Sequence, residues 1–136
     1  MTNVTNWDAG DPHVPAGFGT WGQAISEDVD GVVAIGVNVQ TGSYTLVLAD
    51  GGRSVEMDVA SANNLTVPPN SSVAFPVGTI VEVCQVGAGQ TTVVGGAGVT
   101  VRTPETLVVT GQWSTVSLRK RATDEWVAAG DFEVGA

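Results

Sequence analysis

Two acidic clusters near the N-terminus carry side chains of the kinds that bind metals. Asp8, Asp11 and His13 place two carboxylates and an imidazole close together. The stretch 27–31, Glu-Asp-Val-Asp-Gly, has the acidic start of a calcium loop but lacks the alternating oxygen ligands and the closing glutamate. Since neither cluster has a complete ligand set, we interpret the first as acidic residues on a solvated arm and the second as a turn before the first strand, and we expect no metal and no other cofactor.

No nucleophile in this sequence has an evident base. Cys84 is the single cysteine and His13 the single histidine, and they lie far apart in the chain. No Gly-x-Ser-x-Gly motif is present, and none of the fourteen acidic residues stands out as half of a catalytic pair. Cys84 lies in the apolar stretch 80–86, where we expect a buried thiol that acts as a small hydrophobic side chain. We therefore predict that the protein is not an enzyme.

Two glycine clusters, at 87–89 and 95–98, have the composition of phosphate-binding loops. Such a loop needs a following helix and often a lysine, whereas threonine and valine in strand pattern follow each cluster here. We interpret both clusters as hairpin turns, in which glycine supplies a positive φ.

The net charge of −9 excludes a free-standing nucleic-acid binder, because such a protein needs a broad basic face. Five basic residues are present, and three of them are consecutive: Arg119, Lys120 and Arg121. The preferred interpretation pairs this basic run with acids beside the turn at Asp124. The alternative is a contact between subunits, since copies of so acidic a chain repel one another unless local basic groups meet acids.

Composition and the N-terminus indicate a soluble protein that is made in a cytoplasm. Residues 1–10 contain neither a basic region nor an apolar run, so we expect no signal peptide. No segment approaches the ~20 apolar residues of a membrane span. Charged residues make up 14% of the chain, below the usual ~25%, so uncharged side chains provide much of the polar surface. Such a surface suits a protein that packs against other proteins.

The first thirty residues differ from the rest of the chain. They carry Trp7, Phe18 and Trp21 among prolines and glycines, without a sustained helical or strand period. Aromatic side chains on an irregular segment either fold back on the body or dock on a partner as an arm. We predict an N-terminal arm over residues 1–30 and a β domain over residues 31–136.

Short β-strand patterns fill the chain from about residue 32 onward. Val55, Met57 and Val59 share one face of a strand, and Asp-Gly-Gly at 50–52 has the composition of a hairpin turn before it. Further strands are predicted over 32–39, 43–48, 63–67, 79–86, 91–94, 99–102, 106–110, 115–121 and 125–128. This spacing predicts an all-β fold, a compact antiparallel β-sandwich or barrel of about eight to ten short strands with an irregular N-terminal arm.

Several segments between residues 42 and 132 carry a resemblance to a known group of proteins. They are 44–52 (YTLVLADGG), 64–79 (NLTVPPNSSVAFPVGT), 87–93 (GAGQTTV), 111–114 (GQWS), Leu118 and 124–127 (DEWV). Together they resemble a β domain that recurs in virion proteins of tailed bacteriophages, in tail-fibre-like chains and in small capsid-associated proteins. The resemblance implies a homotrimeric virion component without enzymatic activity, synthesised in the cytoplasm of the host bacterium.

The short N-terminal segment favours a place on the capsid. Fibre proteins with this domain carry a long shaft ahead of it, whereas about forty residues precede it here, without a coiled-coil period. A short arm with the anchors Trp7, Phe18 and Trp21 suits a protein that binds a preformed shell. We expect a capsid decoration protein on the capsid exterior, whose partners are the major capsid protein and its own copies, with no nucleic acid and no membrane.

Two other functions stay open at this point. The first is a tail-fibre or head-fibre tip module that binds sugars of the host envelope through stacked aromatic side chains. Trp113 and Trp126 are of the right type, but both lie beside strand-forming residues, so we expect them in the core. The second is a small hydrolase of envelope polysaccharide, which ranks last because no acid–base pair stands out.

Overall fold

The computed structural model describes residues 34–135 of the 136-residue chain. The arm anchors Trp7, Phe18 and Trp21 and the acidic clusters at 8–13 and 27–31 lie outside the described residues. The chain divides into two units between Ala34 and Ile35, and every element named below belongs to the second unit.

Residues 34–135 form nine strands and one short 3-10 helix, which confirms the prediction of an all-β fold. The elements are β1 (Val37–Gln40), β2 (Tyr44–Thr45), η1 (Leu48–Asp50), β3 (Ser54–Met57), β4 (Asn63–Val67), β5 (Ile80–Gln85), β6 (Thr91–Gly95), β7 (Thr100–Arg102), β8 (Thr115–Ala122) and β9 (Glu125–Gly130). No helix in this part of the chain is long and apolar enough to cross a membrane.

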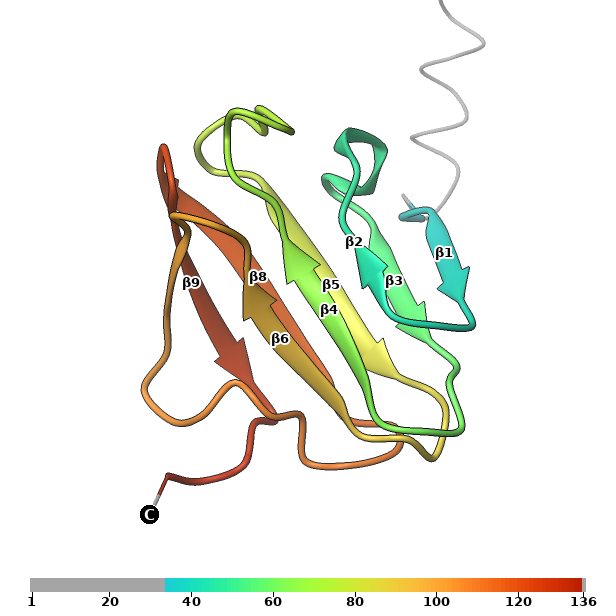
Figure 1. The fold of residues 1–136 in the computed structure, drawn as a ribbon. Coiled ribbons are helices and arrows are strands. Elements are labelled where there is room, and N and C mark those ends of the chain that lie inside the picture. Colours follow the sequence, from blue (N-terminus) through green and yellow to red (C-terminus); the bar gives the residue numbers. More distant parts are fainter. Residues whose placement is uncertain (1–33, 136) are drawn as a thin grey trace, which may run out of the picture. The chain divides into compact units, whose positions relative to one another are not determined.

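The strands lie in two sheets, drawn one behind the other in Figure 1. The larger sheet has the order β1-β3-β5-β8-β9-β7, and the smaller has the order β2-β4-β6. From β1 to β6, consecutive strands alternate between the two sheets. Each strand therefore returns beside the strand two before it and runs in the same direction, so β1, β3 and β5 pair in parallel, as do β2, β4 and β6.

The prediction of an antiparallel fold is wrong for these six strands. Within residues 34–135, antiparallel ladders join β5 to β8 and β8 to β9, and β7 pairs with β9 in parallel. The turns at 50–52, 87–89 and 95–98 are not hairpins, because each joins a strand of one sheet to a strand of the other. The turn at Asp124 does join paired strands, β8 and β9, as predicted.

The glycines at 87 and 89 have a reason other than a positive φ. A Cβ atom on Gly87 would collide with the backbone of Val59, and one on Gly89 with the backbone of Ser61. The segment that joins β3 to β4 and the segment that joins β5 to β6 lie so close together here that a side chain does not fit between their backbones. In the second cluster Gly98 does adopt the expected positive φ, at 79°.

One hydrophobic core joins the two sheets. Val55, Met57 and Val59 are at most 8% exposed, which confirms their predicted shared face. The smaller sheet contributes Leu65 and Val67, and both are fully buried. Alternate residues of each strand enter this core, so the intervening side chains of the larger sheet form its outer face.

Two predicted strands are shorter than expected. The segment 43–48 pairs only at Tyr44 and Thr45, and the chain then bends into η1. The segment 106–110 contributes isolated bridges of Val108 with Thr92 and of Val109 with Phe132 in place of a ladder.

Candidate functional site

The outer face of the larger sheet is defined by residues that share a side in its register. Val37 aligns with Ser54, Ser54 with Glu82, Glu82 with Ser117, and Ser117 with Ala129. Because side chains alternate along a strand, this row points away from the core residues Val55, Val83 and Val116 in the next row.

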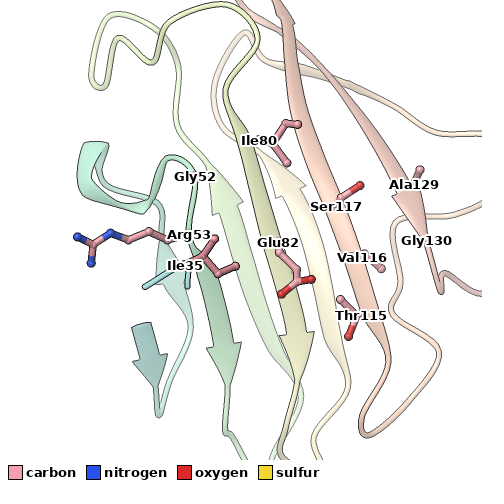
Figure 2. Close-up of a pocket in the computed structure, with 10 residues that line it drawn as sticks. All are labelled: Ile35, Gly52, Arg53, Ile80, Glu82, Thr115, Val116, Ser117, Ala129 and Gly130. Atoms are coloured by element: carbon pink, nitrogen blue, oxygen red, sulfur yellow. The ribbon is translucent and has the colours of Figure 1, made fainter. Parts of the chain in front are cut away.

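A depression of about 390 Å³ lies on this outer face (Figure 2). Its lining comes from β5, β8 and β9 and from the residues ahead of β1 and β3: Ile35, Gly52, Arg53, Ile80, Glu82, Thr115, Val116, Ser117, Ala129 and Gly130. Gly52 lies between Ile35 and Ile80, and its N–H donates to the Ile80 carbonyl oxygen at 2.8 Å. Since glycine has no side chain, a hollow remains between the two isoleucines.

The chemistry of the depression favours binding. Among residues 34–135, the titratable residues of the lining are Arg53 and Glu82, and no second carboxylate, histidine or cysteine of this part of the chain lies there to exchange a proton with Glu82. The hydroxyl groups of Thr115 and Ser117 complete its polar side. The Arg53 guanidinium points away from the depression (Figure 2), so the surface offers a binding partner its shape, its apolar area, hydroxyl groups and the charge of Glu82.

An apolar edge, made of Ile35, Val37, Val39 and Ile80, borders the depression. Each of these side chains is 50–54% exposed. Strand β1, which carries two of them, has β3 as its one ladder partner within residues 34–135. The strand predicted over 32–39 is confirmed from Val37 onward, but the sequence pattern did not reveal that its valines face solvent.

The basic run divides between the outer face and the interior. Arg121 Nη1 lies 2.9 Å from Glu125 Oε1, and Arg102 Nε lies 2.8 Å from Glu125 Oε2. Of the run itself, Arg121 alone makes the predicted pair with a nearby acid within residues 34–135, since Arg102 lies outside the run. The Arg102 hydrogen bond is the main reason that the pKa of Glu125 lies below its usual value. Arg119 is exposed and aligns with Ile80 at the side of the depression.

Lys120 does not fit the alternative in which Arg119, Lys120 and Arg121 form a contact between subunits. Its side chain is 2% exposed, and its ammonium donates to Asn70 Oδ1 at 2.6 Å and to the Phe75 carbonyl oxygen at 2.7 Å. It faces inward because alternate residues of β8 enter the core. Lys120 therefore fixes the loop before β5, where Phe75 also packs edge-on against Trp126 at 5.5 Å.

A buried polar network fixes the start of the body behind the apolar edge. The carboxylate of Asp50, 2% exposed, accepts hydrogen bonds from the Tyr44 hydroxyl at 2.7 Å, the Asn38 amide at 2.9 Å and the Val47 N–H at 2.9 Å. Burial and the hydrogen bond to Asp50 raise the pKa of Tyr44 to about 12. The network ties β1 to β2 and η1 and so holds the edge strand in place.

The two tryptophans of the body have opposite environments. Trp126 is 1% exposed, which confirms its predicted place in the core. The same prediction for Trp113 is wrong, because its side chain is 68% exposed. Its φ of 74° lies in the left-handed region, which costs a side-chain-bearing residue about 1–2 kcal/mol. The preceding Gly111 and Gln112 are the sequence signal for a turn at this position.

The prediction that the Cys84 thiol is buried is wrong. The thiol is free and half-buried, because Cys84 aligns with Glu56 and Thr115 in a row of the outer face. Within residues 34–135, no group of three or more His, Cys, Asp or Glu side chains is placed to hold a metal ion.

Comparisons of this chain with models of protein families, with curated proteins and with solved structures found no match.

Proposed function

We propose that this chain is a structural protein of a tailed-bacteriophage virion, a capsid decoration protein that binds the outside of the shell. In this proposal residues 31–136 form a β-sandwich body, and residues 1–30 form an arm that contacts the major capsid protein. The apolar edge supports the part of the proposal in which the protein packs against other proteins, because four half-exposed aliphatic side chains lie in or beside one depression. Apolar surface of this kind is typical of protein–protein contacts.

A second copy of the same chain is the proposed occupant of this outer face. Arg119 lies on it together with Glu82, so the face carries charges of both signs in a chain whose net charge is −9. Copies that meet here bring arginines to carboxylates, which offsets the repulsion between acidic chains. The resemblance to phage virion domains favours three copies, arranged as a homotrimer.

The composition of the arm supports the shell as its partner. Residues 1–30 hold five of the fourteen acidic residues and none of the five basic residues. Trp7, Phe18 and Trp21 add the aromatic side chains that dominate many protein interfaces. The proposed contact on the major capsid protein is therefore a basic surface with apolar pockets.

Deleting residues 1–25 tests the arm directly. We expect the deletion to abolish binding to purified empty capsids of the phage that encodes the protein, measured by co-sedimentation, with an affinity loss of at least about a hundredfold. The body is expected to remain folded, since its core lies within residues 46–132. Binding that survives the deletion unchanged would contradict the proposal.

Single substitutions sharpen this test. Trp7→Ala, Phe18→Ala and Trp21→Ala each remove one proposed anchor, and Asn6→Ala is the matched control beside Trp7.

A fibre-tip module would instead compete with the phage for adsorption to host cells, so an adsorption assay with the purified protein separates the two functions.

A further inference from the structure

Trp113 and Ile80 lie at opposite ends of β5. β5 begins at Ile80 beside the depression and ends at Gln85, whose carbonyl oxygen accepts a hydrogen bond from the Trp113 N–H at 2.6 Å. Six residues of strand separate the two places by about 17 Å. The exposed indole therefore lies at the far end of β5 from Ile80, next to Thr115 and Gly130, which line the near side of the depression.

Hydrogen bonds on both sides of the tryptophan hold its loop. The Gln112 amide donates to the Val86 carbonyl oxygen at 3.0 Å, and the Ser114 N–H donates to the Gly111 carbonyl oxygen at 3.1 Å. The Gln85 N–H donates to the Ser114 carbonyl oxygen at 3.0 Å. The backbone thus keeps Trp113 in an unfavourable conformation with its ring in solvent, although burying so large an apolar side chain would be favourable. Outliers of this kind occur at binding sites.

The residues that flank Trp113 in its loop are polar or glycine, and none of them is basic. Asp131 lies at its base, because its carbonyl oxygen accepts from the Thr110 hydroxyl at 2.7 Å and its N–H donates to the Thr115 carbonyl oxygen at 3.2 Å. Asp131 is exposed, and within residues 34–135 its carboxylate makes no hydrogen bond or ion pair. Residues 110–115 contain no lysine, arginine or aliphatic side chain, and an aliphatic residue beside them, Val86, is half-buried.

We infer that Trp113 is the stacking platform of a carbohydrate-binding site. A sugar ring presents C–H groups on one face, which pack on an aromatic ring, and hydroxyl groups at its rim, which donate to acceptors. In this site Trp113 supplies the ring, and the acceptors are assigned to the Asp131 carboxylate at the base of the loop and to the side-chain oxygen of the neighbouring Gln112. This inference rests on the body alone and does not depend on the proposed contact with the shell.

Glycan binding by the full-length protein tests the inference. The probe is an array of purified bacterial surface polysaccharides, followed by calorimetric titration with oligosaccharides cut from the polysaccharides that bind. We expect Trp113→Gly to weaken binding at least tenfold, Trp113→Phe to retain part of it, and Asp131→Asn to weaken it severalfold. Glycine accepts a positive φ, so Trp113→Gly is expected to unfold at the same temperature as the parent protein or a higher one.

Four results would overturn the inference. They are the absence of binding to every polysaccharide on the array, binding that Trp113→Gly leaves unchanged, a lower unfolding temperature for Trp113→Gly, and loss of self-association or capsid binding in that variant. The last result would identify the indole as a protein contact. If capsid binding fails in the parent protein while Trp113-dependent glycan binding holds, the proposed function is wrong and this site remains.

Discussion

Tyr44 is the single tyrosine of the chain, so its ionisation can be followed without interference from another tyrosine. Burial and the hydrogen bond to Asp50 raise its pKa from 10.0 to about 12. We predict that the tyrosinate absorbance of the folded protein appears near pH 12, and that the unfolded protein in denaturant titrates near pH 10. A single transition near pH 10 in both states would contradict the hydrogen-bonded network.

The same shift predicts how stability depends on pH at this residue. A pKa that is higher in the folded state means that the contribution of protonated Tyr44 is complete below pH 10 and is lost as the pH rises towards 12. Tyr44→Phe removes this hydrogen bond and is expected to lower the free energy of unfolding by about 1–3 kcal/mol at pH 8. The difference between the two proteins in urea denaturation should shrink above pH 10.

At the scale of elements, the segments that connect the two sheets require glycine where their backbones come into contact. Gly89→Ala places a Cβ against the backbone of Ser61, which cannot rotate away as a side chain can. We predict a loss of about 3 kcal/mol in the free energy of unfolding, the upper end of the range for overpacking, measured by urea denaturation.

Gly42→Ala is the matched control for that substitution. No atom lies within 4 Å of a Cβ at this position, and its φ is not positive, so we expect a change within about 0.5 kcal/mol. Equal losses in the free energy of unfolding at both positions would mean that the segment 87–89 does not lie against the backbone of the segment after β3.

At the scale of the whole molecule, the apolar edge decides whether copies associate. Val37 is 54% exposed and lies outside the core, so Val37→Glu should leave the unfolding temperature nearly unchanged. We predict that Val37→Glu converts the proposed trimer to monomer at micromolar concentrations, because a buried carboxylate without a partner opposes association. Light scattering coupled to size-exclusion chromatography measures this mass.

Val134→Glu provides the same chemical change away from the outer face. Val134 is 79% exposed and follows the last strand, so this variant should keep the mass of the parent protein. A parent protein that is already monomeric, or a Val37→Glu variant that keeps the parent mass, would exclude the outer face as the contact between copies.

Local patterns made most of the strands predictable. Alternation placed Val55, Met57 and Val59 on one buried face, and the turn residues near Asp124 marked the β8–β9 hairpin correctly. Pairing was not predictable in the same way. The segment 50–52 has hairpin composition, yet it carries the chain from one sheet to the other. A turn's composition specifies a local bend and leaves the partner of the following strand undetermined.

The candidate surfaces were harder to predict than the strands. Lys120 lies within a basic run of the sequence, but the alternation of β8 turns it into the body towards Asn70 and Phe75. Trp113 and Trp126 occur in similar sequence surroundings, and one is exposed while the other is buried. Exposure depends on which strands cover a residue, and that is a property of pairing between segments far apart in the chain.

The sequence by itself determined the all-β class, the acidic charge and the separate composition of the first thirty residues, because these follow from local propensity and residue counts. The tertiary structure decided the parallel pairing, the depression between Ile35 and Ile80, and the exposure of Trp113. Each of these features depends on how distant segments pack around one shared core. The alternation of apolar and polar residues along a strand shows which side chains share a face, but it does not specify which strands lie side by side.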